Sequence, residues 1–316
     1  MTDASAIARR PWLVAVWPGM GQVALTAGYY LMSRLRMHEA DTIPVRDLFD
    51  VEHVDVKDGL VRMGRLPQSR LFLRKDPDGR RDGAVFIGEA QPPLGKHAFC
   101  TRLLDAAGRL GVDTVFTFAA MATSMHPSAP SRVLGVATHP EGLPELRRHG
   151  VEIMPDGRIT GLNGVFLAAA AERGMTGIGL LGEIPAFAAQ LPFPKASAAV
   201  LAVFSRMVGL PIDLRELEEY GRAMEEQLAQ IVRQMQEALR PGAPPSEEEA
   251  EAVEARPEPA PARPEPDEAA RRRIEELFRE AARDRSKTFE LKRELDRLGL
   301  FKDYEDRFLD LFRRPE

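Results

Sequence analysis

The chain has 316 residues, of which 44% are hydrophobic and 29% charged, a composition typical of globular proteins with a substantial core. Its formal net charge of -5 argues against broad binding to nucleic acids or to a membrane surface, and we expect neither as a partner. The single cysteine, Cys100, excludes an intrachain disulfide and a metal site built from several thiolates of one chain. We expect no metal, no cofactor and a cytoplasmic location.

The first two thirds of the chain alternate short apolar runs with helical patterns. This alternation predicts a mostly parallel sheet covered by helices on both faces. The turn Lys57-Asp58-Gly59 predicts a hairpin, which would make the sheet mixed. The predicted strands are 12–17, 54–56, 60–63, 84–87, 114–118, 133–137 and 177–181, and the predicted helices are 22–36, 96–110, 162–173 and 195–208.

A long helix is predicted to begin after Pro211-Ile212-Asp213, with Asp213 as its N-cap and Glu216 completing a capping-box-like pattern. Its apolar residues repeat at heptad spacing. That spacing fits a coiled-coil seam between subunits, and it fits a helix lying on its own domain at least as well. The stripe consists of Leu217, Gly221, Met224, Leu228, Ile231 and Met235.

The composition changes abruptly to Pro, Glu and Ala between Pro241 and Asp267. Such a segment buries too little apolar area to offset its chain entropy, so we expect an extended linker. Three amphipathic stripes follow, which predicts a small helical module or docking tail. We therefore divide the chain into an α/β domain over 1–240, a linker over 241–268 and a helical tail over 269–316. The stripes are Ile274, Leu277, Phe278 and Ala281; Leu291, Leu295 and Leu298, ended by Gly299; and Tyr304, Phe308 and Phe312.

The stretch Gly19-Met20-Gly21-Gln22-Val23-Ala24 has the G-x-G-x-x-G/A spacing of a dinucleotide-binding turn. Such a site also needs a second parallel strand that ends in an acidic residue about twenty residues further on. Glu39 and Asp41 have that spacing, but the apolar run at Ile43 and Val45 follows these acids instead of preceding them. We therefore favour a strand-to-helix turn in which the glycines allow close packing.

Two strand ends share a pattern, "FIGEAQPP" with Glu89 and "LLGEIPAF" with Glu183. Because the carboxyl ends of parallel strands meet at one edge of a sheet, we expect a cleft there. The two carboxylates could act as general acid and base or bind a cation, although hydrogen bonds that order a loop are the favoured interpretation. The candidate cleft residues are Gly19, Gly21, Glu89, His126, Asn163 and Glu183.

Other motifs with known chemistry are missing from the sequence. The six histidines show neither H-x-x-x-H nor H-E-x-x-H spacing, so a zinc site is not expected. The sequence also has no G-x-S-x-G elbow and no Walker A motif. We assign no catalytic residue.

The run "RVLGVATHPEGLPELRRHGVEIMPDGRITGLNGVFLAAAAERGMTGIGLLGEIPAF" is more specific than any single motif. Together with Pro18-Gly19-Met20-Gly21 and with Ser205-Arg206-Met207-Val208-Gly209-Leu210, it resembles the proteasome assembly chaperone family in its prokaryotic branch, over about residues 12–236. The resemblance implies a three-layer α/β/α sandwich, similar to nucleoside phosphorylases and related hydrolases, and assembly into homo-oligomers. Some relatives dock on proteasome rings through a C-terminal hydrophobic-Tyr-X motif. This chain has Pro315 where the tyrosine should stand, so that mode of docking does not carry over.

The function we expect is that of a non-enzymatic, oligomeric, assembly-chaperone-like protein that binds other proteins, with a client that the resemblance does not identify. The tethered helices would capture a partner or dock onto a neighbouring subunit, and the linker would raise their effective concentration. The alternative is a small-molecule binding protein, or a hydrolase- or phosphorylase-like enzyme, that takes a nucleoside or phosphorylated ligand in the strand-end cleft. In that alternative the N–H groups of 19–22 would bind an anion. The proposed partner contacts are Leu277, Phe278, Phe308 and Phe312.

Overall fold

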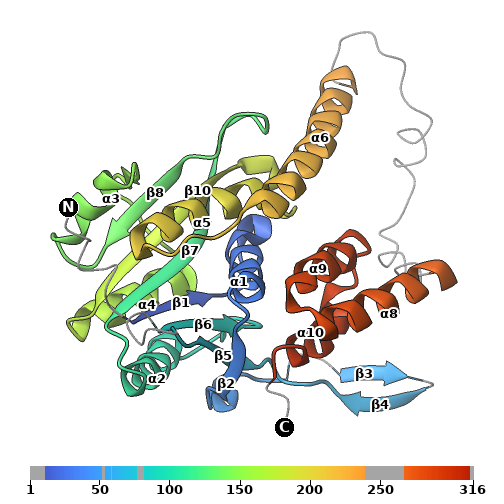
Figure 1. Ribbon diagram of the computed structural model, residues 1–316, viewed down its shortest axis with the longest axis horizontal. Helices are drawn as coiled ribbons and strands as arrows, with labels where there is room; N and C mark the ends of the chain where they lie inside the picture. Colours follow the sequence, from blue (N-terminus) through green and yellow to red (C-terminus); the bar gives the residue numbers. More distant parts are fainter. Residues whose placement is uncertain (1–10, 52–53, 58, 77–81, 239–266, 314–316) are drawn as a thin grey trace.

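The computed structural model describes residues 11–51, 54–57, 59–76, 82–238 and 267–313, and its core is an eight-stranded mixed sheet (Figure 1). The strands lie in the order β2-β5-β6-β1-β7-β10-β8-β9. Strands β6, β1, β7 and β10 run parallel, as do β8 and β9, whereas β2 with β5, β5 with β6, and β10 with β8 are antiparallel. The bounds are β1 Trp12–Val16, β2 His38–Thr42, β5 Ser69–Arg74, β6 Gly83–Gly88, β7 Thr114–Thr123, β8 Val133–Ala137, β9 Glu152–Ile153 and β10 Thr176–Pro185.

Helices cover both faces of this sheet. Strand β1 is buried on both sides: Trp12, Val14 and Val16 belong to one core, and Leu13, Ala15 and Trp17 to the other. Because successive side chains of a strand point to opposite faces, this alternation requires a helical layer on each side. The predicted three-layer α/β/α sandwich is therefore confirmed. Helices α1 (Val23–Arg34) and α5 (Pro194–Val208) form one layer, α2 (Lys96–Arg109) and α4 (Gly161–Glu172) form the other, and α3 (Gly142–Arg148) flanks β8 and β9.

The sheet is mixed for a different reason from the one the sequence suggested. The predicted hairpin forms, as β3 (Val54–Lys57) and β4 (Leu60–Met63), but it is a separate two-stranded ribbon. The antiparallel pairs come from β2, β5 and β8, and the first two of these strands were not predicted. Strand β2 is the polar sequence HEADT at the edge of the sheet, so it lacks the apolar alternation of a half-buried strand.

The long helix α6 (Arg215–Ala238) packs against α5 of its own domain. Leu217 and Leu228 are buried, and a Cβ on Gly221 would come within 3.2 Å of the backbone nitrogen of Lys195. The first half of the apolar stripe therefore packs on its own domain, and it does not form a coiled-coil seam between subunits. Asp213 accepts a hydrogen bond from the backbone N–H of Arg215, as a residue before a helix does. The side chains at 231 and 235 lie outside the described residues.

The C-terminal module is defined here as helices α8 (Glu268–Arg283), α9 (Thr288–Arg297) and α10 (Phe301–Asp310) with the turns that join them. Asp267 caps α8 by accepting a hydrogen bond of 2.7 Å from the backbone N–H of Ala270. The predicted linker lies outside the described residues except at this cap. Short 3₁₀ helices complete the described elements at Met20–Gln22, Arg46–Leu48, Ala186–Ala188 and Arg285–Lys287.

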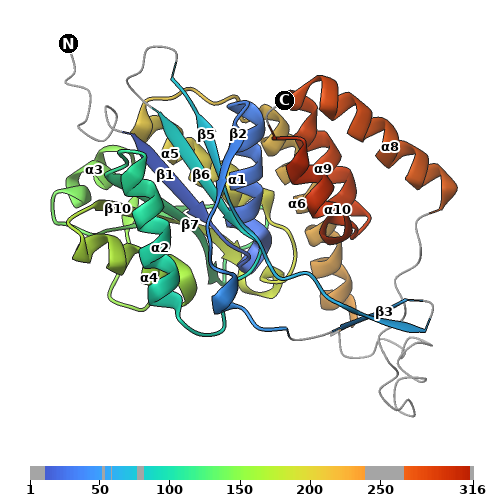
Figure 2. The ribbon, with the colours of Figure 1, turned by 90° about the horizontal axis from the view of Figure 1, so that it is seen from below.

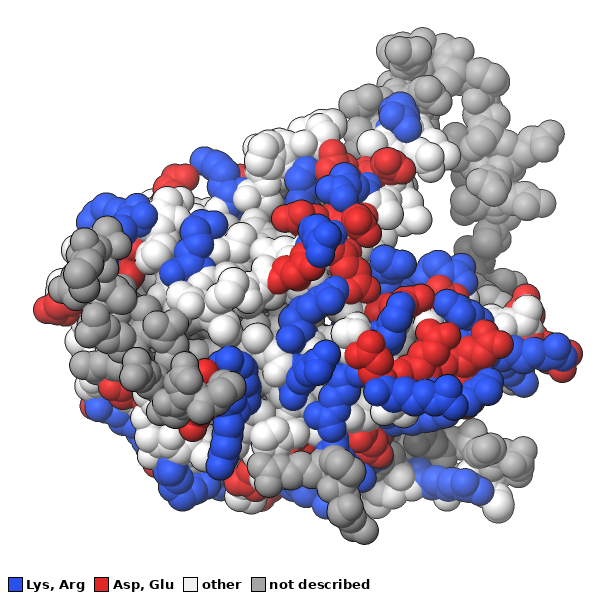
Figure 3. Space-filling view, viewed as in Figure 1, with Lys and Arg blue, Asp and Glu red and all other residues white. Residues whose placement is uncertain are grey.

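The C-terminal module packs against α1 and the β2–β5 edge of the sheet (Figure 2). Aromatic rings interlock across this contact: Tyr30 meets Phe289 at 4.7 Å between centroids, and Phe72 of β5 meets Phe312 at 6.0 Å. The backbone N–H of Glu39 in β2 also donates to the carbonyl of Phe312. Lys, Arg, Asp and Glu dominate the visible outer face of these helices (Figure 3), as expected when the apolar stripes point inward.

None of the helices in the described ranges is both long enough and apolar enough to span a membrane.

Candidate ligand pocket at the strand ends

The glycine-rich turn after β1 uses two of its four backbone N–H groups for hydrogen bonds within the fold. Gly21 and Gln22 are both left-handed, with φ of 62° and 50°. The N–H of Gly21 donates to the carbonyl of Ala189 at 2.7 Å, and that of Gln22 donates to the carbonyl of Gly19 at 3.1 Å. Of the four N–H groups at 19–22 that were expected to meet an anion, those of Gly21 and Gln22 are therefore already used within the fold.

Only one of the two glycines in this turn is required by packing. A Cβ on Gly21 would lie 3.2 Å from the Ile184 side chain and 3.4 Å from Phe193. Gly19 is extended, with φ of -167°, and a Cβ there would meet nothing within 4 Å. The close-packing interpretation therefore holds at Gly21, and Gly19 borders open space.

Glu89 lies beneath the C-terminal module. Its carboxylate accepts hydrogen bonds from Nη1 of Arg65 at 2.8 Å and from the backbone N–H of Gln68 at 3.0 Å. Nζ of Lys302, from α10, lies 3.4 Å from its main-chain carbonyl oxygen. Burial raises the pKa of Glu89 and outweighs these bonds. The carboxylate thus binds the segment 65–68 through one oxygen, while its Oε1 is buried without a hydrogen-bond partner among the described residues.

Glu183 lies in β10 and is held by a different partner. Arg132 donates to its carboxylate from Nε and Nη2, both at 2.9 Å, and Thr123 donates its hydroxyl at 2.8 Å. The hydrogen bonds from Arg132 lower the pKa of Glu183. Strands β1 and β7 separate β6 from β10, so Glu89 and Glu183 are about 14 Å apart at a spacing of about 4.8 Å per strand. They do not form an acid–base pair.

His126 lies in the loop after β7, where its Nδ1 contacts the hydroxyl of Ser128 at 2.6 Å. This contact lies within the loop, and His126 does not line the cavity at the carboxyl ends of β1, β7 and β10.

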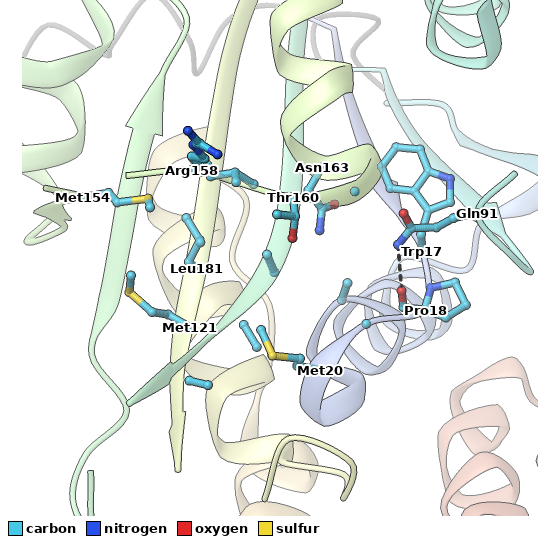
Figure 4. A pocket seen from close by; sticks show the side chains of 17 residues that line it. Trp17, Pro18, Met20, Gln91, Met121, Met154, Arg158, Thr160, Asn163 and Leu181 are labelled. Atoms are coloured by element: carbon cyan, nitrogen blue, oxygen red, sulfur yellow. Dashed lines mark hydrogen bonds between the residues drawn. The ribbon is translucent and has the colours of Figure 1, made fainter. Parts of the chain in front are cut away.

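A cavity of about 360 Å³ does open at the carboxyl ends of β1, β7 and β10 (Figure 4). Of the six cleft candidates, only Gly19 and Asn163 line it. Three further lining residues, Met20, Ala120 and Met121, lie at the strand ends where the sequence placed them. The rest of the wall was not predicted and consists of Trp17, Pro18, Ala24, Gln91, Ala119, Ala122, Met154, Arg158, Ile159, Thr160, Gly161 and Leu181.

Gln91 builds the wall between the first strand and α4. Its Nε2 donates to the carbonyl of Pro18 at 3.1 Å, and its Oε1 accepts from the backbone N–H of Leu162 at 3.0 Å. Gly161 has φ of 73°, and a Cβ there would lie 2.8 Å from Oε1 of Gln91, so only glycine fits. The sequence could have indicated Gln91 as a site residue, because it lies two residues after Glu89 in the strand-end motif "GEAQPP".

The polar groups of the pocket favour a negatively charged ligand. Among the described residues that line the pocket, Arg158 is the only one with a charged side chain. The N-terminus of the twelve-residue helix α4 meets the cavity at Gly161, and helix N-termini carry partial positive charge. Oδ1 of Asn163 is buried and accepts no hydrogen bond from any described residue.

A model of the PAC2 family matches residues 13–232. The chain belongs to the PAC2 family. The matched region contains the whole sheet except Trp12, the first residue of β1, and it ends inside α6, so the C-terminal module lies outside the PAC2 match. The strand-end pocket lies wholly within it.

Among curated proteins, an uncharacterised protein of Methanocaldococcus jannaschii is 29% identical over 170 residues, which are 52% of this chain and 64% of that protein. The chain thus spans less than two thirds of that relative's length. Among solved structures, Pyrococcus furiosus PbaB, described as an archaeal proteasome activator, is 26% identical with a TM-score of 0.60, covering 70% of this chain and 93% of PbaB. PbaA of the same organism, described as an archaeal homologue of proteasome-assembly chaperone, is 25% identical with a TM-score of 0.54, covering 73% of this chain and 90% of PbaA.

Proposed function

We propose that this PAC2 protein is an oligomeric, assembly-chaperone-like protein that binds other proteins, and that a second copy of the chain binds at the β3–β4 hairpin. The descriptions of PbaB and PbaA, a proteasome activator and a homologue of a proteasome-assembly chaperone, support the general role. The observation that carries the proposal is the exposed apolar face of the hairpin, which extends away from the eight-stranded sheet (Figures 1 and 2).

The hairpin face is formed by Val54, Val56, Val61 and Met63. Val54 pairs with Met63 and Val56 with Val61, so all four side chains lie on the same side of the ribbon. The exposed fraction is 48% for Val54, 68% for Val56, 70% for Val61 and 73% for Met63. A contiguous apolar face exposed to this degree is typical of an interaction site.

A second copy suits this face for two reasons. An isolated two-stranded hairpin is marginally stable in water, and a second ribbon supplies the further strands and apolar surface that stability requires. Twofold symmetry also places the same face opposite itself, so an uncharged apolar face meets an uncharged apolar face without an unpaired charge. Burial of each of these side chains would contribute about 1–2 kcal/mol.

The C-terminal module has a different place in this proposal from the one expected. Leu277, Phe278, Phe308 and Phe312 are 1%, 3%, 1% and 0% exposed within the chain itself. A partner could reach them only after the module leaves α1. We therefore assign the module to stabilising the α/β domain and place the contact between copies at the hairpin face.

The test is the oligomeric state of the full chain carrying Val56→Glu together with Met63→Glu. Arg62→Glu is the matched control, because Arg62 is exposed on the same strand but lies on the opposite side of the ribbon. The double variant should dissociate and the control should not. Equal association of the two variants would refute the assignment.

A further inference from the structure

We propose that the strand-end pocket binds an organic carboxylate that carries an N–H donor and an apolar side group, the chemistry of an N-acylated amino acid or of the last residue of a peptide. This site lies at the ends of β1, β7 and β10, whereas the hairpin face lies on a separate ribbon. The assignment of a pocket ligand and the assignment of the hairpin face as a contact between copies can therefore be refuted independently.

The charge of the pocket selects an anion. Its lining contains Arg158 and no carboxylate, and Arg158 forms no ion pair with another residue in the described ranges. A guanidinium fork matches the two oxygens of a carboxylate. The N-terminus of α4 adds positive potential from the same side of the cavity.

Asn163 indicates that the ligand also carries a hydrogen-bond donor. Its Oδ1 is buried without a hydrogen-bond donor, and a buried acceptor left unpaired costs free energy. The amide nitrogen of Gln91 donates to the carbonyl of Pro18, and no described residue donates to Asn163. A ligand that places an N–H beside its carboxylate would satisfy Asn163 while its oxygens meet Arg158. Figure 4 shows Arg158, Thr160 and Asn163 along one side of the cavity.

The opposite side of the pocket is apolar. Met20 and Met121 lie there (Figure 4), and Met154 and Leu181 add apolar surface nearer to Arg158. Thioether side chains adapt to ligands of varied shape and contact aromatic rings favourably. The ribose hydroxyls of a nucleotide would be buried against these apolar groups without hydrogen bonds, and burial of an unpaired hydroxyl costs free energy. An apolar side group next to the carboxylate fits this wall better.

The experiment uses the fluorescence of Trp17, which lines the cavity, in the full-length chain carrying Trp12→Phe. The probe is N-acetyl-L-phenylalanine. Two analogues each lack one feature: N-acetyl-L-phenylalaninamide has no carboxylate, and 3-phenylpropionate has no N–H donor. We expect saturable binding of the probe and binding at least about tenfold weaker for each analogue. No saturation by the probe up to about 10 mM would overturn the proposal, and so would equal binding of all three compounds.

Variants locate the binding in the pocket. Arg158→Gln and Asn163→Leu should each weaken probe binding about tenfold or more. Arg147→Gln, at an exposed arginine outside the pocket, should leave it unchanged. Equal affinity of the Arg158 and Arg147 variants would place the binding elsewhere and contradict the proposal. Inorganic phosphate that binds as tightly as the probe would reduce the site to a simple anion site and contradict it too.

A hexapeptide that ends in phenylalanine separates the two sources of this chemistry. Tighter binding of the hexapeptide than of the probe identifies a protein C-terminus as the ligand. Weaker binding identifies a free acylated amino acid. Both outcomes support the shared chemistry.

Discussion

The hydroxyl of Tyr29 in α1 donates a hydrogen bond of 2.8 Å to Oε1 of Glu305 in α10, across 276 positions of sequence. Both side chains are 1% exposed, and Nζ of Lys302 donates to the other carboxylate oxygen at 2.7 Å. Burial, followed by the charge of Glu305, raises the pKa of Tyr29. If the module shifted, a buried donor or acceptor would lose its partner, which costs free energy. This hydrogen bond therefore fixes the position of the C-terminal module on α1.

Removal of the Tyr29 hydroxyl should loosen the C-terminal module. We expect Tyr29→Phe to lower the free energy of unfolding by about 1–2 kcal/mol, because Glu305 loses a donor while it stays buried. Amide hydrogen exchange should accelerate in α8–α10 more than in α2. Tyr304→Phe is the control, since the described residues show no hydrogen bond to the Tyr304 hydroxyl. Equal exchange in the two variants would show that the bond does not hold the module.

Arg70 of β5 should be sensitive even to a change that keeps its charge. It is 1% exposed and donates to Gln68 at 2.9 Å, to Asp306 at 2.7 Å and to Asp310 at 3.4 Å. A lysine cannot reproduce this planar fork, so Arg70→Lys should lower stability by about 1–3 kcal/mol in urea unfolding. Arg74→Lys on the same strand should cost less. A larger loss at Arg74 would contradict the role given to Arg70.

Glu183 should contribute to stability in a pH-dependent way. Arg132 lowers its pKa below the ordinary value of 4.5, so the folded chain holds this proton less tightly than the unfolded chain. The contribution is therefore present above about pH 4.5 and is lost as the pH falls through the lower folded value. Glu183→Gln should remove this acid-dependent part and cost about 0.5–1 kcal/mol at pH 7, a modest value because the exposed Arg132 is screened by solvent.

Glu89 should change the free energy of unfolding with pH in the opposite direction to Glu183. Burial raises its pKa, so its contribution to stability decreases as the pH rises from 4.5 through the higher folded value. Denaturant titrations of Glu89→Gln should lack this decrease. Identical pH profiles for the two glutamine variants would contradict both assignments.

The two glycines of the first strand-to-helix turn should differ. Gly21→Ala introduces a Cβ at φ of 62° and close to Ile184, and we expect a loss of about 1–2 kcal/mol from the left-handed backbone alone. Gly19→Ala should change stability by less than about 0.5 kcal/mol, because the site is open. Thermal unfolding of the two variants measures the difference. A larger loss at Gly19 would show that this glycine has a role that packing does not explain.

Much of the fold was predictable because the central strands are buried on both faces. Runs such as 84–87 and 133–137 are short, apolar and bounded by turn residues, and both form strands where expected. The two strands at the β2 end of the sheet were not predictable by the same rule. β2 is polar, and β5 carries Arg70, which donates hydrogen bonds to two carboxylates of α10, more than 230 positions away. No local pattern reports a contact of that kind.

The candidate site was only partly predictable. The sequence placed Gly19 and Asn163 at the strand ends, and both line the pocket. It also grouped Glu89 with Glu183 because their motifs match, although the strand order separates them. Strand order depends on long-range pairing, which one sequence does not display. Arg158 escaped notice because it lies in a loop whose position is set by the whole fold.

The central claim, association of the α/β domain through the hairpin face, is tested most directly by the solution mass of the full-length protein. Sedimentation equilibrium should give the wild type and Arg62→Glu a multiple of the 35.1 kDa chain mass, and Val56→Glu with Met63→Glu a mass of 35.1 kDa. A wild-type chain of 35.1 kDa at the highest concentration reached, or a double variant that keeps the wild-type mass, would contradict it.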